Sequence, residues 1–220
     1  MNILTLGDSF TYGEELTSPS SACWPARLAT KLSSQLINLG TPSNSNPAMV
    51  RQLLDYFSHR TNSTPDLVIV AWSSPGRTEH SDISGNYNLW PGYSGNLFKE
   101  HQPWREELLR YTNQYHNDTY LGEAFLQQVI LVQNFLENRN IRYLMLNTVG
   151  NEYYKNNFIR QFGYYKHLLN VDNFIGWPDN GMAEWVGDAP RGPNGHFLED
   201  GHIIVAERIN DNIRNRGWVS

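Results

Sequence analysis

The 220-residue sequence has little cysteine, no block of one charge and no long apolar run, and each absence excludes a class of protein. The single cysteine, Cys23, allows neither a disulfide framework nor a cysteine-based metal site. The net charge is −5 and the Lys and Arg residues are scattered, so we expect no nucleic-acid partner. No apolar segment is long enough to cross a bilayer, so we expect no membrane insertion. Residues 1–6 carry no basic segment or cleavage site, which predicts a cytoplasmic protein.

The composition favours one folded domain spanning residues 1–220. Hydrophobic residues make up 40% of the chain, which is enough for a substantial core. Aromatic residues make up 13%, and many of them lie in stretches rich in Gly, Pro and Asn. Such rings either line a cleft or pack beneath long loops. No feature of the sequence indicates a bound cofactor.

Short apolar runs alternate with segments of helical periodicity, which predicts a parallel sheet with helices on both faces. The expected fold is α/β with three layers, about five parallel strands and a long insertion after the third strand. The predicted strands are residues 3–6, 36–39, 67–72 and 141–146, and the predicted helices are residues 22–33, 48–58, 121–137 and 201–215.

Two long segments interrupt this alternation. Residues 73–117 are rich in Gly, Asn, Tyr and Trp, and we expect an ordered insertion over the carboxyl edge of the sheet, with a helix near 104–111. Residues 148–195 are irregular as well, with a helix expected near 156–169.

Polar residues and glycine follow three of the predicted strands. Ser9 follows the first strand, Gly40 with Asn44 and Asn46 the second, and the pair at 73–74 the third. Ligands bind beyond the carboxyl ends of the strands in open parallel sheets, so these positions predict a cleft. A serine in a tight turn after a buried strand presents its hydroxyl and its backbone N–H to such a cleft.

Residues 7–13, Gly-Asp-Ser-Phe-Thr-Tyr-Gly, resemble the first signature block of the SGNH/GDSL hydrolases, with Phe10 at the usual Leu. They do not match the nucleophile elbow of the α/β-hydrolases, because Thr11 stands at the second glycine. The resemblance implies a flavodoxin-like fold and an ester hydrolase whose nucleophile is Ser9. Asp8 is expected to fix the turn or to cap the next helix.

The C-terminal block of residues 196–207 is similar to the family's histidine block, with Phe197 in place of the usual Pro. The resemblance implies that His196 is the general base. His202, with Glu199 three residues before it, is the rival base. A metal site made of His196, Glu199, Asp200 and His202 is a further alternative, but no second cluster completes it, so none is predicted.

The sequence departs from the family at two positions. Pro193 stands where the family keeps an Asp that orients the histidine, and the nearest upstream acid is Asp188. Pro75 stands where the family keeps its oxyanion Asn, and Ser74 or Arg77 are the candidate substitutes.

The remaining oxyanion donors are expected to be the backbone N–H groups of Ser9 and Gly40, with Asn46 added from the second block. Asn44 and Arg77 are the candidate substrate-binding residues. Arg77 either binds a carboxylate or phosphate of the ligand or forms a structural ion pair with a loop acid.

These features favour a hydrolase of a small polar or carbohydrate-linked ester. The alternative is a catalytically degenerate protein of the same fold that serves binding or assembly. A third hypothesis, a flavodoxin-like phosphate-binding protein, is weakened by Asp8, whose charge repels phosphate. Residues 72–77 and 90–95 resemble a divergent branch of the family found mainly in bacteriophage genomes, which predicts a virus-encoded protein.

Overall fold

The computed structural model describes residues 1–82, 85–89, 118–148 and 165–219, together with residues 107, 110 and 114. Within these residues no helix is both long and apolar enough to cross a membrane.

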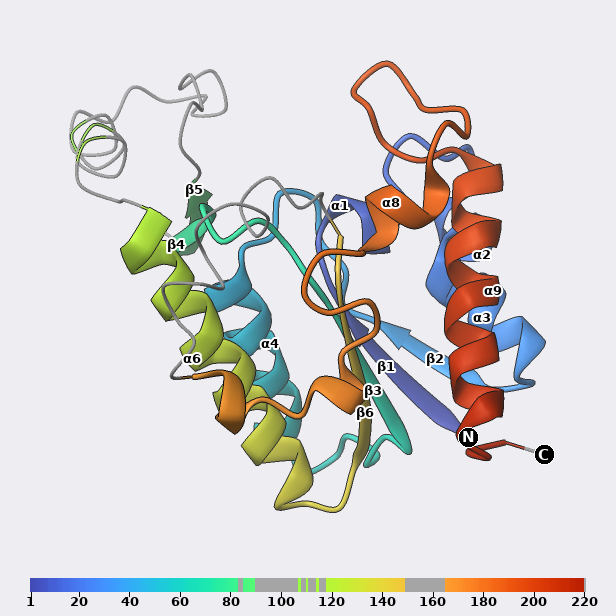
Figure 1. Cartoon of the computed structure of the whole chain (residues 1–220), viewed down its shortest axis with the longest axis horizontal. Helices are drawn as coiled ribbons and strands as arrows, with labels where there is room; N and C mark the ends of the chain where they lie inside the picture. Colours follow the sequence, from blue (N-terminus) through green and yellow to red (C-terminus); the bar gives the residue numbers. More distant parts are fainter. Residues whose placement is uncertain are drawn as a thin grey trace.

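The centre of the fold is a parallel sheet of 4 strands in the order β2-β1-β3-β6 (Figure 1). The strands are β1 (Asn2–Leu6), β2 (Gln35–Asn38), β3 (Leu67–Trp72) and β6 (Arg142–Asn147). Every residue of β3 is buried, as its continuous apolar run predicts for a central strand. The strands align in register, with Leu4 opposite Ile37 on one side and Val68 on the other.

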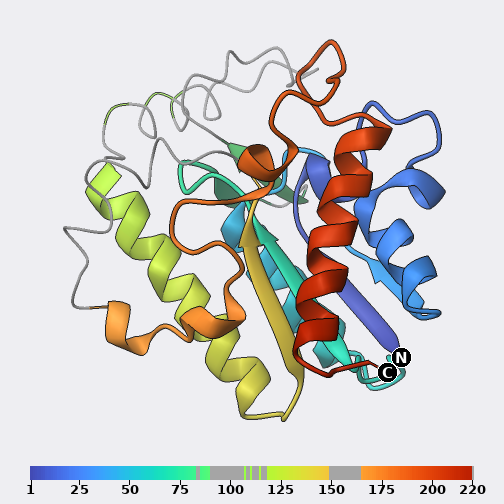
Figure 2. The ribbon, with the colours of Figure 1, turned by 45° about the vertical axis from the view of Figure 1, so that its right-hand side comes forward.

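Helices cover both faces of the sheet and make the three predicted layers. The pair α4 (Asn46–Ser58) and α6 (Asp118–Glu137) lies on one face (Figure 1). The other face is covered by α3 (Trp24–Lys31) and α9 (Glu199–Asn215), which pack side by side (Figure 2). The shorter helices are α1 (Ser9–Tyr12), α2 (Pro19–Ala22), η2 (Lys166–Leu168), η3 (Val171–Asn173) and α8 (Met182–Val186).

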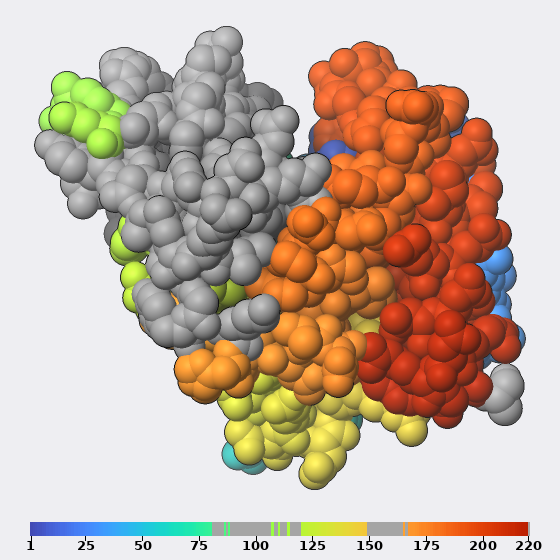
Figure 3. All heavy atoms as spheres, viewed as in Figure 1, coloured from blue at the N-terminus to red at the C-terminus, as the bar shows by residue number. Residues whose placement is uncertain are grey.

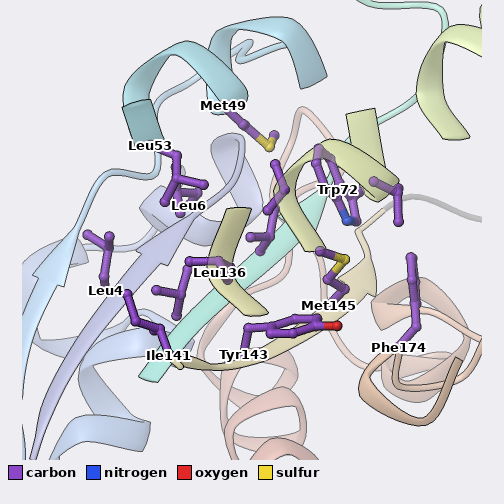
Figure 4. Packing of buried hydrophobic residues seen from close by; sticks show 14 of the residues in the cluster. Leu4, Leu6, Met49, Leu53, Trp72, Leu136, Ile141, Tyr143, Met145 and Phe174 are labelled. Atoms are coloured by element: carbon purple, nitrogen blue, oxygen red, sulfur yellow. The ribbon is translucent and has the colours of Figure 1, made fainter. Parts of the chain in front are cut away.

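Each face of the sheet has its own hydrophobic core. Side chains of the sheet pack with α4 and α6 on one side (Figure 4). Trp72 and Phe125 meet there edge to face, with ring centroids 5.7 Å apart. The opposite core joins the sheet to α3 and α9, and Trp24 and Phe197 are fully buried in it. Residues from 165 onward cover one side of the molecule as a continuous surface (Figure 3).

The strand count differs slightly from the prediction of about five. Within the described residues the sheet has 4 strands, and a fifth position is reduced to one parallel bridge between Met145 and Phe174. The Ile175 N–H completes this bridge by donating to the Met145 carbonyl at 2.8 Å. The segment turns away at once into Gly176, whose φ is +77°, so no ladder follows.

The described start of the predicted insertion is an antiparallel hairpin of β4 (Thr78–Asp82) and β5 (Gly85–Leu89). Glu79 holds it to α4 through Arg51, with contacts of 2.7 to 3.1 Å to the guanidinium. The Ser45 hydroxyl at the start of α4 donates to Asn88 Oδ1 at 2.6 Å. The helix predicted near 104–111 and most of the one predicted near 156–169 lie outside the described residues.

Candidate active site

Ser9 is the first residue of α1, directly after the turn that follows β1, at the carboxyl edge of the sheet (Figure 1). A β-carbon on Gly7 would come within 2.0 Å of Thr11 Oγ1, so the turn folds back onto α1 only with glycine there. Asp8 caps α1, as expected, by accepting the Phe10 N–H at 3.1 Å. The Ser9 N–H donates to no other described residue.

The structure brings His196 to Ser9, with Nε2 of the imidazole 2.9 Å from Oγ of the serine. The histidine stands on a tight loop in which Gly195 has a φ of +84° and the Gly192 N–H donates to the His196 carbonyl at 2.9 Å. The Phe10 ring lies 5.0 Å from the imidazole and packs against it. This arrangement is the geometry that a nucleophile and its general base require.

The other imidazole nitrogen of His196, Nδ1, lies 2.9 Å from Oε2 of Glu15. The carboxylate also accepts the His196 N–H at 3.1 Å and the Asn194 N–H at 2.9 Å. Desolvation by itself would raise the pKa of Glu15, but these hydrogen bonds and the nearby imidazole lower it below its usual value. Glu15 was not predicted, because the family resemblance places the acid next to the histidine; the adjacent acids at 14 and 15, close behind Ser9, were the available signal.

Asp188, the acid expected to orient His196, does not contact it. Asp188 is exposed and lies in the turn after α8, where the Ala189 N–H donates to the Val186 carbonyl at 3.2 Å. The loop continues outward from there, so the structure places Glu15, and not Asp188, on Nδ1.

A second carboxylate flanks the histidine. Glu14 Oε2 lies 3.4 Å from Nε2 of His196, on the side that faces Ser9, and the Glu14 side chain is 42% exposed. The Glu14 N–H donates to the Ser9 carbonyl at 3.0 Å, which fixes the backbone of this acid beside the nucleophile.

Asp8 is fully buried and binds the ends of two other strands. Its Oδ2 accepts the Ser73 hydroxyl at 2.7 Å and the Thr148 hydroxyl at 3.1 Å. Arg77 Nη1 lies 3.4 Å from the same oxygen and 3.3 Å from the Asn44 carbonyl. Arg77 therefore forms the structural ion pair that was one of its two predicted roles, and its partner is Asp8.

Most of the predicted oxyanion donors already have acceptors within the fold. The Gly40 N–H donates to Asn38 Oδ1 at 2.9 Å. The amide of Asn46 accepts the Ser73 N–H at 2.9 Å and donates to the Ser73 carbonyl at 3.0 Å. Ser74 differs, because its hydroxyl accepts the N–H of residue 76 at 3.3 Å and its own hydrogen is not used in that bond.

Asn44, a predicted substrate-binding residue, is buried between elements of the fold. Its amide donates to the Gly7 carbonyl at 3.1 Å and to Gln52 Oε1 at 2.8 Å. Both amide hydrogens therefore join the β1 turn to α4. Together, these contacts leave the Ser9 N–H and the Ser74 O–H as the predicted donors with no acceptor among the described residues.

His202, the rival base, is buried behind the site and does not contact Ser9. Its Nδ1 accepts the Trp24 N–H at 3.1 Å, and burial lowers its pKa to about 4. Glu199 pairs with Arg27 at 3.0 Å rather than with this histidine. His202 is thus a neutral residue that joins α9 to the start of α3. The alternative metal site does not form, since no group of three or more ligand-type side chains gathers in the described part of the chain.

The fold defines the class: the chain has the SGNH/GDSL hydrolase fold, which it shares with solved lipolytic proteins of the G-D-S-L family. The crystal structure of TesA matches 98% of this chain and 99% of its own, with a TM-score of 0.61 and 13% identity. An esterase, EstA from Pseudoalteromonas, matches 98% of this chain and 97% of its own, with a TM-score of 0.58 and 14% identity. A family two carbohydrate esterase from Clostridium thermocellum matches 99% of this chain and 65% of its own, with a TM-score of 0.55 and 15% identity.

Residues 14–220 match the model of a family of unknown function, DUF6071, and the chain belongs to that family. No curated protein matches the sequence. The predicted phage-type branch stays a prediction.

Proposed function

We propose that the protein is a serine ester hydrolase in which Ser9 is the nucleophile and His196 the general base. The observation that carries this proposal is the 2.9 Å contact between Ser9 Oγ and His196 Nε2. The two residues lie at opposite ends of the chain, and a serine–imidazole contact at the carboxyl edge of a parallel sheet is what acyl transfer requires.

In the first half of the reaction Ser9 Oγ attacks the acyl carbon while its proton passes to Nε2 of His196. The oxyanion that forms accepts the Ser9 N–H. The tetrahedral intermediate then collapses, the C–O bond to the alcohol breaks, and Nε2 returns the proton to the leaving oxygen. In the second half a water loses its proton to Nε2 and attacks the acyl carbon of the acyl-serine. The C–O bond to Ser9 Oγ then breaks, Nε2 returns the proton to that oxygen, and the carboxylic acid leaves.

We further propose that the substrate is a small polar or carbohydrate-linked ester. Two considerations support this substrate. Neighbours in fold include carbohydrate esterases, one of them in complex with cellohexaose. The candidate site is polar: the predicted residues Arg77 and Ser74 are incompletely buried, and so is Glu14, which the structure adds.

The test is a panel of p-nitrophenyl acyl esters and O-acetylated sugars, with Ser9→Ala and His196→Ala beside the wild type. We expect hydrolysis and fluorophosphonate labelling by the wild-type protein, and a loss of both with each variant. Activity on acetyl esters of sugars above that on long-chain esters would support the substrate class. Equal signals from all three proteins would overturn the hydrolase proposal.

One observation favours the rival function, a binding or assembly module of the same fold. Gly40 and Asn46 are bound within the fold, so the oxyanion is left with few of the predicted donors. The loss of one such donor costs about 2.7–4 kcal/mol in the transition state. If the rival is correct, Ser9 stays unlabelled by fluorophosphonate, and the ester panel shows no turnover.

A further inference from the structure

We propose that Glu15 is the acid that orients the catalytic histidine, and that Gly192 leaves open the space this acid needs. The family that the sequence resembles supplies this acid from the histidine loop, three residues before the histidine, where this chain has Pro193. Here the acid comes from the nucleophile's own turn, six residues after Ser9 in the sequence. The proposal rests on the proposed function.

The contacts of His196 define its tautomer. A carboxylate only accepts hydrogen bonds, and the pKa of Glu15 is lowered, so Nδ1, 2.9 Å from Oε2, carries the proton. A neutral imidazole with its proton on Nδ1 has a lone pair on Nε2. That lone pair faces the Ser9 hydroxyl at 2.9 Å, as a general base requires.

Both oxygens of the Glu15 carboxylate accept hydrogen bonds from the histidine loop. Oε1 accepts the backbone N–H and the side-chain amide of Asn194 at 2.9 and 3.1 Å. Oε2 accepts the backbone N–H of His196 at 3.1 Å in addition to Nδ1. One side chain therefore holds both the imidazole and the loop that carries it.

The backbone of Glu15 has a φ of +68°. A non-glycine residue in this left-handed region is strained and persists only where surrounding contacts impose it. The Glu15 side chain is only 10% exposed although it is charged. Both features indicate that the turn is built to deliver this carboxylate to the histidine loop.

Gly192 lies against the carboxylate of Glu15. A β-carbon at this position would lie 2.6 Å from Cδ and 2.6 Å from Oε2 of Glu15. No left-handed φ forces a glycine here, so the space for the Glu15 carboxylate accounts for it. The acid on the nucleophile turn and the missing side chain on the histidine loop are complementary parts of one arrangement.

Glu15 acts through His196, so it is a positioning residue, and the test needs a readout besides the rate. We propose to follow the downfield proton resonance of His196 Nδ1–H by NMR in the wild type, Ser9→Ala and Glu15→Gln. The signal is expected in the wild type and in Ser9→Ala, and is expected to be lost or shifted upfield in Glu15→Gln. An unchanged signal in Glu15→Gln would overturn the proposal whether or not the protein is an enzyme.

Kinetics give the second measurement. Glu15→Gln is expected to lower kcat about 10²- to 10⁴-fold with little change in KM, because Glu15 lies on the far side of the imidazole from Ser9. Asp188→Asn is the matched control, since this exposed acid was the candidate suggested by the sequence and should keep the wild-type kcat. Wild-type kcat in Glu15→Gln, or an equal loss in Asp188→Asn, would contradict the assignment.

A double-mutant cycle tests the role of Gly192. Gly192→Ala should lower kcat nearly as much as Glu15→Ala, because the added methyl displaces the carboxylate. In a Glu15→Ala chain the same change should cost nothing further, because the space is then vacant. Additive losses would show that Gly192 serves some other purpose. Ser9→Ala separates the two proposals: if it keeps wild-type turnover, the hydrolase proposal fails, and the NMR signal alone decides the role of Glu15.

Discussion

The backbone N–H of Trp24 donates a 3.1 Å hydrogen bond to Nδ1 of His202, and both residues are fully buried. The first residue of α3 is thereby joined to α9, across the face of the sheet that these two helices cover. This contact has a measurable consequence for stability, because it requires an unprotonated imidazole.

The pH dependence of stability follows from the pKa of His202, which burial lowers from 6.5 to about 4. Between these values the unfolded chain binds a proton that the folded chain does not. The contribution of the neutral His202 to the free energy of unfolding is therefore fully present above pH 6.5. It is lost as the pH falls towards 4, which lowers the free energy of unfolding by about 3 kcal/mol in total. Urea unfolding at pH 7.5, 5.5 and 4.5 should show this fall in the free energy of unfolding with decreasing pH for the wild type, and a smaller pH slope for His202→Gln. The exposed His59→Gln is the control and should keep the wild-type slope.

The network around Asp8 predicts a second effect on stability. Asp8→Asn would place an amide hydrogen against the Ser73 and Thr148 hydroxyls and remove the negative charge beside Arg77. We expect a loss of about 2–4 kcal/mol in the free energy of unfolding, measured in urea.

The control for Asp8 is Asp55→Asn on α4. Asp55 also pairs with an arginine, at 3.1 Å, but it is 59% exposed, so its replacement should cost less than about 1 kcal/mol. Similar losses from the two substitutions would show that burial of the Asp8 network contributes little.

Glu14 predicts selectivity for the charge of the substrate, provided that the protein hydrolyses esters. Its carboxylate lies 3.4 Å from Nε2 of His196, so an anionic group near the scissile bond is repelled. At this half-exposed position the effect should be about 1 kcal/mol, or about 5-fold in kcat/KM. Glu14→Gln should raise the kcat/KM ratio of an anionic to a neutral ester by that factor, and added salt should shrink the difference.

The matched variant for this measurement is Glu207→Gln, which removes a carboxylate from α9 that pairs with Lys31 at 3.5 Å. It should leave the anionic-to-neutral ratio unchanged. The selectivity role of Glu14 is wrong if both variants shift the ratio equally or if neither shifts it.

Cys23 provides a probe of local opening. The thiol is 1% exposed, and burial raises its pKa, so little thiolate is present at neutral pH. Native protein should react with a thiol-specific disulfide reagent far more slowly than protein in 8 M urea, where the single thiol should titrate completely. Rapid labelling of native protein would mean that the region around α2 and α3 opens readily.

Much of the fold could be predicted because its signals are local. The fully apolar run of 67–72 is the buried central strand β3, and helical spacing marks α4, α6 and α9 to within a few residues. The pairing of Ser9 with His196 was predicted as well, because a family resemblance at each end of the chain indicated it. In the structure Ser9 Oγ and His196 Nε2 lie 2.9 Å apart.

The polar contacts of the site could not be predicted in the same way. Asn44 and Asn46 were expected to serve the substrate or the oxyanion, yet their amides bind Gly7, Gln52 and Ser73. Residue type alone does not show whether a side-chain amide that follows a strand has a structural or a chemical role. Only the direction of its donors, which packing fixes, distinguishes the two roles.

The sequence by itself determined the α/β class, the strand ends that form the site and the candidate nucleophile and base, because periodicity and short motifs depend on neighbouring residues. Tertiary structure alone decided which acid contacts His196. Glu15 lies 181 residues away in the sequence, and its partnership depends on a left-handed turn after α1 and on the space beside Gly192. A hydrogen bond between distant segments is set by how their loops pack, and residue types along the chain do not record that packing.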